Sequence, residues 1–120
     1  MNNYRKFFLV LALVTGCFIF YISSQSYPYN PLVKFQFSSY LYHFGIFFLF
    51  SLFLFLAGKF EKEYILFVIF FSAFYAGLDE YHQLFVLNRS AAIFDFYIDS
   101  LGILTSAFIF DIYNKFIKRS

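Results

Sequence analysis

Long apolar segments dominate the chain, and short polar segments separate them. The apolar segments cover about residues 7–22, 41–58, 64–86 and 91–113. A bilayer core about 30 Å thick requires about 20 helical residues, and all four segments reach or approach that length once their interfacial ends are counted. The Phe-rich runs lack the period-two alternation of barrel strands. The pattern predicts an all-α polytopic membrane protein, a bundle of four transmembrane helices in a single domain over residues 1–120.

The composition strengthens the assignment to the membrane. Hydrophobic residues make up 62% of the chain, aromatic residues 28% and charged residues 13%, whereas soluble domains carry about 25% charged residues. We therefore expect membrane lipids as partners and no nucleic acid. The single cysteine, Cys17, lies within the first apolar segment, and we interpret it as a small buried apolar residue.

The distribution of the nine lysines and arginines predicts the orientation in the membrane. With the N-terminus in the cytoplasm, seven of these cations lie on the cytoplasmic side, and only Lys34 and Arg89 lie outside. Such an excess of cytoplasmic cations is typical of membrane proteins. An even number of spans then places both termini in the cytoplasm and the connection 23–40 outside.

Polar residues within the predicted spans are the strongest functional signal. An acid at the centre of a membrane helix costs about 2.5–3.5 kcal/mol, so such residues usually face the bundle interior or water. Spacings of i, i+4, i+7 and i+11 place small and polar residues on one face of the third and of the fourth segment: Ser72, Ala76, Asp79 and Gln83, and Asp95, Asp99, Gly102 and Ser106. Small residues on these faces would let the two helices approach closely and leave the carboxylates in a polar cleft.

Several roles are open to these residues. Asp95 and Asp99, one helical turn apart, repel each other unless they are paired, protonated or bound to a metal. Arg89 is the nearby outer cation, and its planar group suits carboxylates and phosphates. His43 alone is better explained as an interfacial or core histidine with a satisfied hydrogen bond than as a ligand, and a hydrated helix end would explain Asp79 with Glu80 equally well. Asp111 and Lys115, four residues apart, are expected to form an exposed helix-surface pair.

The polar residues also carry a resemblance to a known family. The chain resembles the VanZ-like family of bacterial membrane proteins in the segment 20–25, in His43-Phe44, in the block Asp79-Glu80-x-x-Gln83-x-Phe85, and in the later Arg89, Asp95, Asp99 and Gly102. It departs from the family pattern at Leu87-Asn88, where Pro-Gly is common, and at Ser39-Tyr40, where Asp-Lys is common. The resemblance spans most of the chain and implies a bacterial cytoplasmic membrane protein.

The resemblance also implies a field of function, because the founding member of the family is associated with resistance to the glycopeptide teicoplanin. Our first hypothesis is a binding protein for an anionic lipid, a lipid-linked cell-wall precursor or a glycopeptide antibiotic. Its candidate ligand-binding residues are Ser24, His43, Asp79, Glu80, Gln83, Arg89, Asp95 and Asp99.

Two alternatives remain open. The first is an intramembrane enzyme, with Glu80 or His82 as general base. Such an enzyme could use a divalent metal ion as a cofactor. The candidate metal ligands are the carboxylates of Asp79, Glu80, Asp95 and Asp99. The second alternative is a proton or ion pathway, which requires polar groups through the full membrane depth.

Overall fold

The computed structural model consists of four α-helices, which confirms the predicted fold class. It describes residues 2–25, 36–58, 61–86 and 93–119. The helices are α1 (Asn3–Ser23), α2 (Gln36–Ala57), α3 (Lys62–Gln83) and α4 (Ile93–Arg119). The described residues contain no strand.

Local sequence explains where the helices begin and end. The Asn2 side chain caps α1 by accepting a hydrogen bond of 2.8 Å from the backbone N–H of Arg5. Helix α3 ends at Gln83, although the apolar pattern continues to Val86, because the next three backbone N–H groups bond carbonyls three residues earlier and form a tighter turn. Helix α4 continues beyond the predicted end at residue 113 and reaches Arg119.

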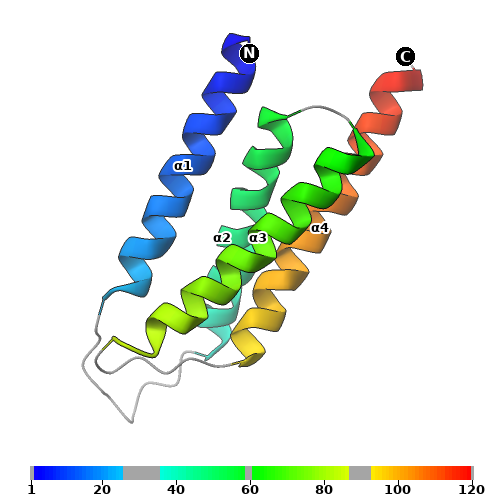
Figure 1. Cartoon of the computed structure of the whole chain (residues 1–120). Helices are drawn as coiled ribbons and strands as arrows, with labels where there is room; N and C mark the ends of the chain where they lie inside the picture. Colours follow the sequence, from blue (N-terminus) through cyan, green and yellow to red (C-terminus); the bar gives the residue numbers. More distant parts are fainter. Residues whose placement is uncertain (1, 26–35, 59–60, 87–92, 120) are drawn as a thin grey trace.

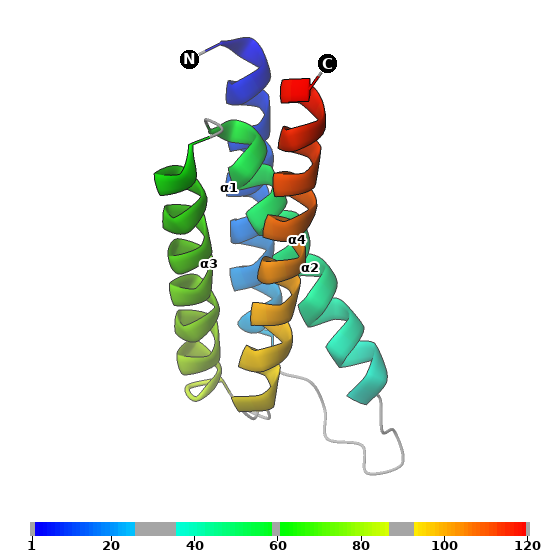
Figure 2. The same ribbon diagram turned by 90° about the vertical axis from the view of Figure 1, so that its right-hand side faces the viewer.

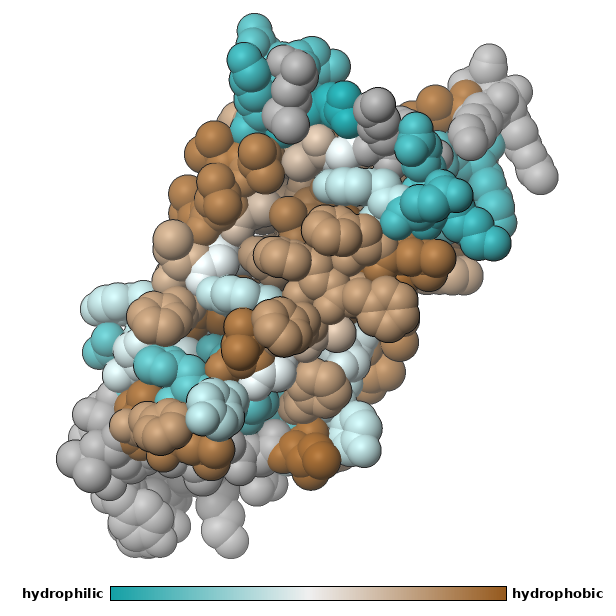
Figure 3. Space-filling view, viewed as in Figure 1, coloured by the Kyte–Doolittle hydropathy of each residue, from teal (hydrophilic) through white to brown (hydrophobic). Residues whose placement is uncertain are grey.

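All four helices are long and apolar enough to cross a membrane. They run along one common direction, and both termini lie at the same end of the bundle (Figures 1 and 2). Large apolar side chains cover the outside, as with Phe70 and Phe108, which are 70% and 65% exposed. Figure 3 shows this apolar surface between more hydrophilic ends. The chain is therefore a multi-pass membrane protein.

Helix α2 makes the most extensive contacts in the bundle. It packs most extensively against α4 and α1, whereas α1 and α3 approach each other least among the pairs in contact. The central core combines Ile19, Phe47, Phe50, Ala76 and Ile103, with at least one residue from each helix. A second cluster on the side of the termini joins α2, α3 and α4 through Phe55, Val68, Ala107 and Phe110.

The structure corrects two details of the sequence interpretation. Gly102 lies against α2 and not against α3, because a Cβ at this position would come within 2.4 Å of the Phe44 carbonyl oxygen. Cys17 is exposed, not buried. It lies on a face of α1 that the neighbouring helices do not cover.

Candidate functional site

Four ionisable side chains from three helices meet at the end of the bundle opposite the termini. We call His43 of α2, Glu80 of α3, and Asp95 and Asp99 of α4 the His43 cluster. His43 Nδ1 lies 2.8 Å from Asp99 Oδ1, and His43 Nε2 lies 3.7 Å from Asp95 Oδ2. Single ligand atoms of His43, Glu80 and Asp95 all lie within 4.8 Å of one another.

The hydrogen bond between His43 and Asp99 fixes the state of the imidazole ring. A carboxylate only accepts, so the short contact requires that Nδ1–H donates to Asp99. In a neutral ring Nε2 then carries a lone pair and is directed toward Asp95. The orienting carboxylate thus leaves Nε2 available for a proton, a cation or a substrate group.

The members of the cluster are mostly buried between the helices. The side chain of Asp99 is 0% exposed, that of His43 9% and that of Asp95 14%. Glu80 is also buried, at 9%. Helices α2 and α4 pack closely at Gly102, about one turn from Asp99, and Asp95 is the most exposed member of the cluster.

Asp79 and Gln83 lie beside the cluster on the buried face of α3. Gln83 Nε2 donates to Asp79 Oδ2 at 3.5 Å. The predicted stripe on α3 is confirmed, since Ser72, Ala76, Asp79 and Gln83 are all buried.

Ser24 and His82 form a separate contact between α1 and α3. Their side chains lie 2.9 Å apart, from Ser24 Oγ to His82 Nε2, and the His82 ring stacks on Phe20 with centroids 4.6 Å apart. The Ser24 hydroxyl also donates to the Phe20 carbonyl at 2.8 Å, so its single proton leaves Nε2–H of His82 as the donor in the first contact. The two candidate bases from the sequence therefore face different neighbours: Glu80 belongs to the His43 cluster, and His82 contacts α1.

Arg89 lies outside the described residues. In the sequence it follows the end of α3 at Gln83 and precedes the start of α4 at Ile93. Its proposed role as a cation near the acids stays a prediction.

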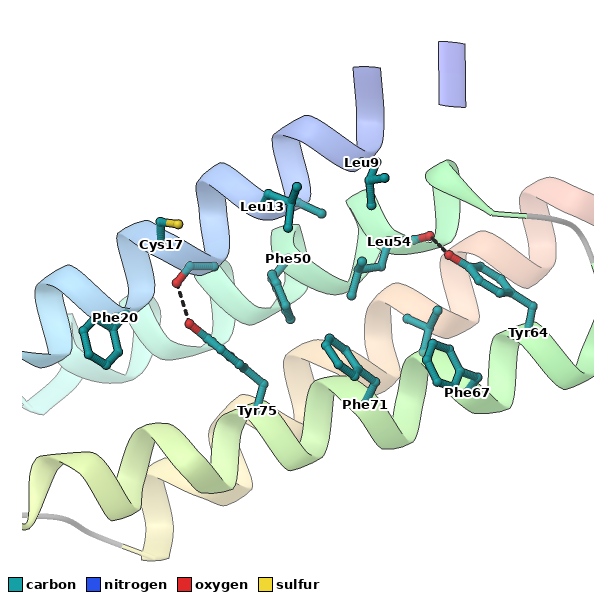
Figure 4. Close-up of a pocket in the computed structure, with 13 residues that line it drawn as sticks. Leu9, Leu13, Cys17, Phe20, Phe50, Leu54, Tyr64, Phe67, Phe71 and Tyr75 are labelled. Carbon is teal, nitrogen blue, oxygen red and sulfur yellow. Dashed lines mark hydrogen bonds between the residues drawn. The ribbon is translucent and has the colours of Figure 1, made fainter. Parts of the chain in front are cut away.

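An apolar cavity that the sequence did not predict lies between α1 and α3. Its volume is about 570 Å³, and its lining includes Gly16, Cys17, Phe20, Phe71 and Tyr75 (Figure 4). Lining residues such as Phe20 and Phe71 are 56% and 43% exposed, so the cavity opens on the apolar surface. Sequence patterns describe single helices, and a cavity that forms because two helices diverge leaves no signal in them.

Two tyrosine hydroxyls bridge neighbouring helices at this cavity. Tyr75 donates to the Gly16 carbonyl of α1 at 2.5 Å. Tyr64 donates to the Leu54 carbonyl of α2. Both hydroxyls are therefore satisfied by backbone carbonyls, and the remaining lining is hydrocarbon and sulfur.

Comparison with known proteins identifies the family. No curated protein and no solved structure matches the chain significantly. The sequence model of the VanZ/LLP1 family matches residues 7–114, nearly the whole chain. The chain therefore belongs to the VanZ/LLP1 family.

Proposed function

We propose that this protein binds an anionic lipid or a lipid-linked component of the bacterial cell envelope. The hydrocarbon chain of the ligand occupies the cavity between α1 and α3, and its headgroup lies at the end of the bundle that carries the His43 cluster. A role in resistance to glycopeptides such as teicoplanin, and a location in the cytoplasmic membrane with this end outward, belong to the same proposal.

The observation that carries the proposal is that α3 contributes both to the apolar cavity and to the polar cluster. Tyr75 lines the cavity, Asp79 lies one helical turn further along the same helix, and Glu80 belongs to the cluster. Phe20 lines the cavity near its polar end, where it stacks on His82. A site that is apolar along its length and polar at one end matches a molecule with a hydrocarbon chain and a polar headgroup.

The bilayer environment determines what fills the cavity. Water requires about two to four polar partners to occupy an internal site, and both tyrosine hydroxyls of the lining already donate to backbone carbonyls. The neighbouring solvent at this depth is lipid hydrocarbon. A chain from the ligand therefore enters from the bilayer with little desolvation cost.

The proposal is tested by filling the cavity from its wall. Cys17 lines the cavity, so Cys17→Trp should exclude the chain and lower lipid affinity about tenfold, which corresponds to about 1.4 kcal/mol. The matched control is Val14→Trp, on an exposed residue of the same helix outside the cavity lining. Lipids retained through detergent purification are identified and quantified by mass spectrometry. Equal retention by wild type and both variants would contradict the proposal.

The contact between His43 and Asp99 favours a second candidate function, an intramembrane enzyme. A histidine oriented by a carboxylate is a common general base, so His43 replaces His82 as the better candidate. The same purified samples separate the two functions. An enzyme converts a supplied envelope lipid to a product of different mass, whereas a binding protein returns it unchanged. Among the described residues the buried ionisable side chains all lie at one end, so an ion pathway is the less favoured alternative.

A further inference from the structure

We infer that His43, Glu80 and Asp95 form a binding site for one divalent transition-metal ion, of the kind of Zn²⁺ or Mn²⁺. The assignment of the ligands depends only on the cluster geometry. The role of the ion, which rests on the proposed function, is to present positive charge to an oxygen of the anionic headgroup.

The orientation of the His43 ring is the first argument. In a neutral ring whose Nδ1–H donates to Asp99, the lone pair of Nε2 faces Asp95 Oδ2 at 3.7 Å. This distance exceeds that of a hydrogen bond, and two acceptors that face each other repel. A cation between them turns this repulsion into attraction.

The ligand types and spacing agree with a metal site. One imidazole nitrogen and two carboxylate oxygens suit borderline metals such as Zn²⁺. Ligands bound at about 2.1 Å in tetrahedral geometry lie about 3.4 Å apart, close to the observed 3.7 Å between His43 and Asp95. Glu80 offers the third ligand atom within 4.8 Å of both, a separation that a small side-chain rotation closes.

Asp99 completes the arrangement as a positioning residue. Metal-bound histidines usually donate their second N–H to a carboxylate, which fixes the ring and increases its basicity. Asp99 Oδ1 accepts this bond, while its Oδ2 is buried and has no hydrogen-bond partner among the described residues. The positive charge of a nearby divalent ion offsets the cost of burying that oxygen.

Three protein ligands leave one coordination position for another oxygen. Asp95 keeps 14% of its side chain exposed, so this position can face the edge of the bundle where a headgroup would lie. A bound ion would thereby reconcile an acidic cluster with an anionic ligand, since the carboxylates hold the metal and the metal holds the phosphate or carboxylate of the lipid.

Zn²⁺ titration of the full-length, chelator-treated protein in detergent tests the site. We expect one bound ion per chain by calorimetry and elemental analysis. His43→Asn should weaken binding about tenfold or more, and Asp99→Asn should weaken it by about 10- to 100-fold. The matched control is His82→Asn, because His82 is the other histidine of the chain and lies near the same end; it should bind like wild type.

Two results would overturn the metal site: no binding above background in wild type, or unchanged binding in His43→Asn. Either result would leave a protonated His43 as the charge partner of the acids.

Cu²⁺ bound to the wild type gives a test without substitution. Electron paramagnetic resonance of the bound Cu²⁺ must show coupling to an imidazole nitrogen, and the absence of this coupling would contradict the site. Lipid retention distinguishes the two proposals: lipid bound without metal removes only the metal, and metal bound without lipid removes only the lipid.

Discussion

The contact between His43 and Asp99 is the polar interaction that defines the site at the scale of single residues. It joins α2 to α4 across 56 residues of sequence, and both partners are buried. In such surroundings an N–H that loses its acceptor has no water to replace it. We therefore expect the pair to matter for stability as well as for ligand binding.

Asp99→Ala should lower the free energy of unfolding by about 1–3 kcal/mol, because it leaves the Nδ1–H group of His43 without an acceptor. The matched control on the same helix is Asp111→Ala, since Asp111 pairs with Lys115 at 3.2 Å but is 46% exposed; this change should cost about 0–1 kcal/mol. Reversible unfolding by denaturing detergent measures both values. Equal effects of the two substitutions would contradict a structural role for the buried pair.

The sequence predicted which polar side chains are buried better than it predicted which residues they contact. Helical spacing correctly placed Asp99, Ser106 and Gln83 on buried faces, and the i, i+4 rule correctly predicted the exposed pair of Asp111 and Lys115. It did not predict that Asp99 would bind His43, because a contact between helices depends on how each helix is rotated about its axis.

At the scale of helices, the close approach of α2 and α4 shapes the site. Gly102 has no Cβ. A Cβ at this position would be too close to the Phe44 carbonyl group and the Phe48 backbone nitrogen of α2. Small residues allow such approach in membrane helices, where van der Waals packing drives association. The approach also brings the two aspartates of α4 next to His43.

Gly102→Ala should destabilise the protein by about 1–3 kcal/mol, because the added methyl group meets backbone that cannot move without separating the helices. Gly45→Ala is the matched control, since a Cβ at Gly45 meets nothing within 4 Å; it should be neutral or stabilise by about 0.5–1 kcal/mol. Thermal unfolding of both variants in detergent gives the comparison. A Gly102→Ala protein as stable as Gly45→Ala would show that the close approach is not needed.

Sequence patterns located the helices better than they located the gaps between them. The apolar segments predicted four helices. Helix α3 ends earlier than its apolar segment, at Gln83, where a tighter turn follows, and α2 and α4 extend beyond their apolar segments to begin at Gln36 and end at Arg119. The interpretation of Cys17 as buried was wrong for a physical reason. In a membrane an apolar side chain is equally stable facing lipid, so hydropathy does not distinguish the core from the surface.

At the scale of the whole molecule, the bundle has one end with buried acids and one end with chain termini. Both termini lie at the same end of the bundle (Figure 1), as four spans require, and the cation distribution predicts that they lie in the cytoplasm. The buried acids would then lie toward the outer face of the membrane. The lining of the apolar cavity between α1 and α3 extends from Leu9 and Tyr64, nearer the termini, to Phe20 and Tyr75, nearer the buried acids.

Photo-crosslinking with an anionic phospholipid that carries a diazirine in its acyl chain tests the central claim most directly. The reagent is incorporated into membranes that contain the full-length protein, and the modified residues are mapped by mass spectrometry. The account predicts that adducts concentrate on the cavity lining, such as Cys17, Phe71 and Tyr75, and that Cys17→Trp removes them. Adducts spread evenly over exposed residues outside the cavity, such as Phe74 and Phe108, with no change in Cys17→Trp, would contradict it.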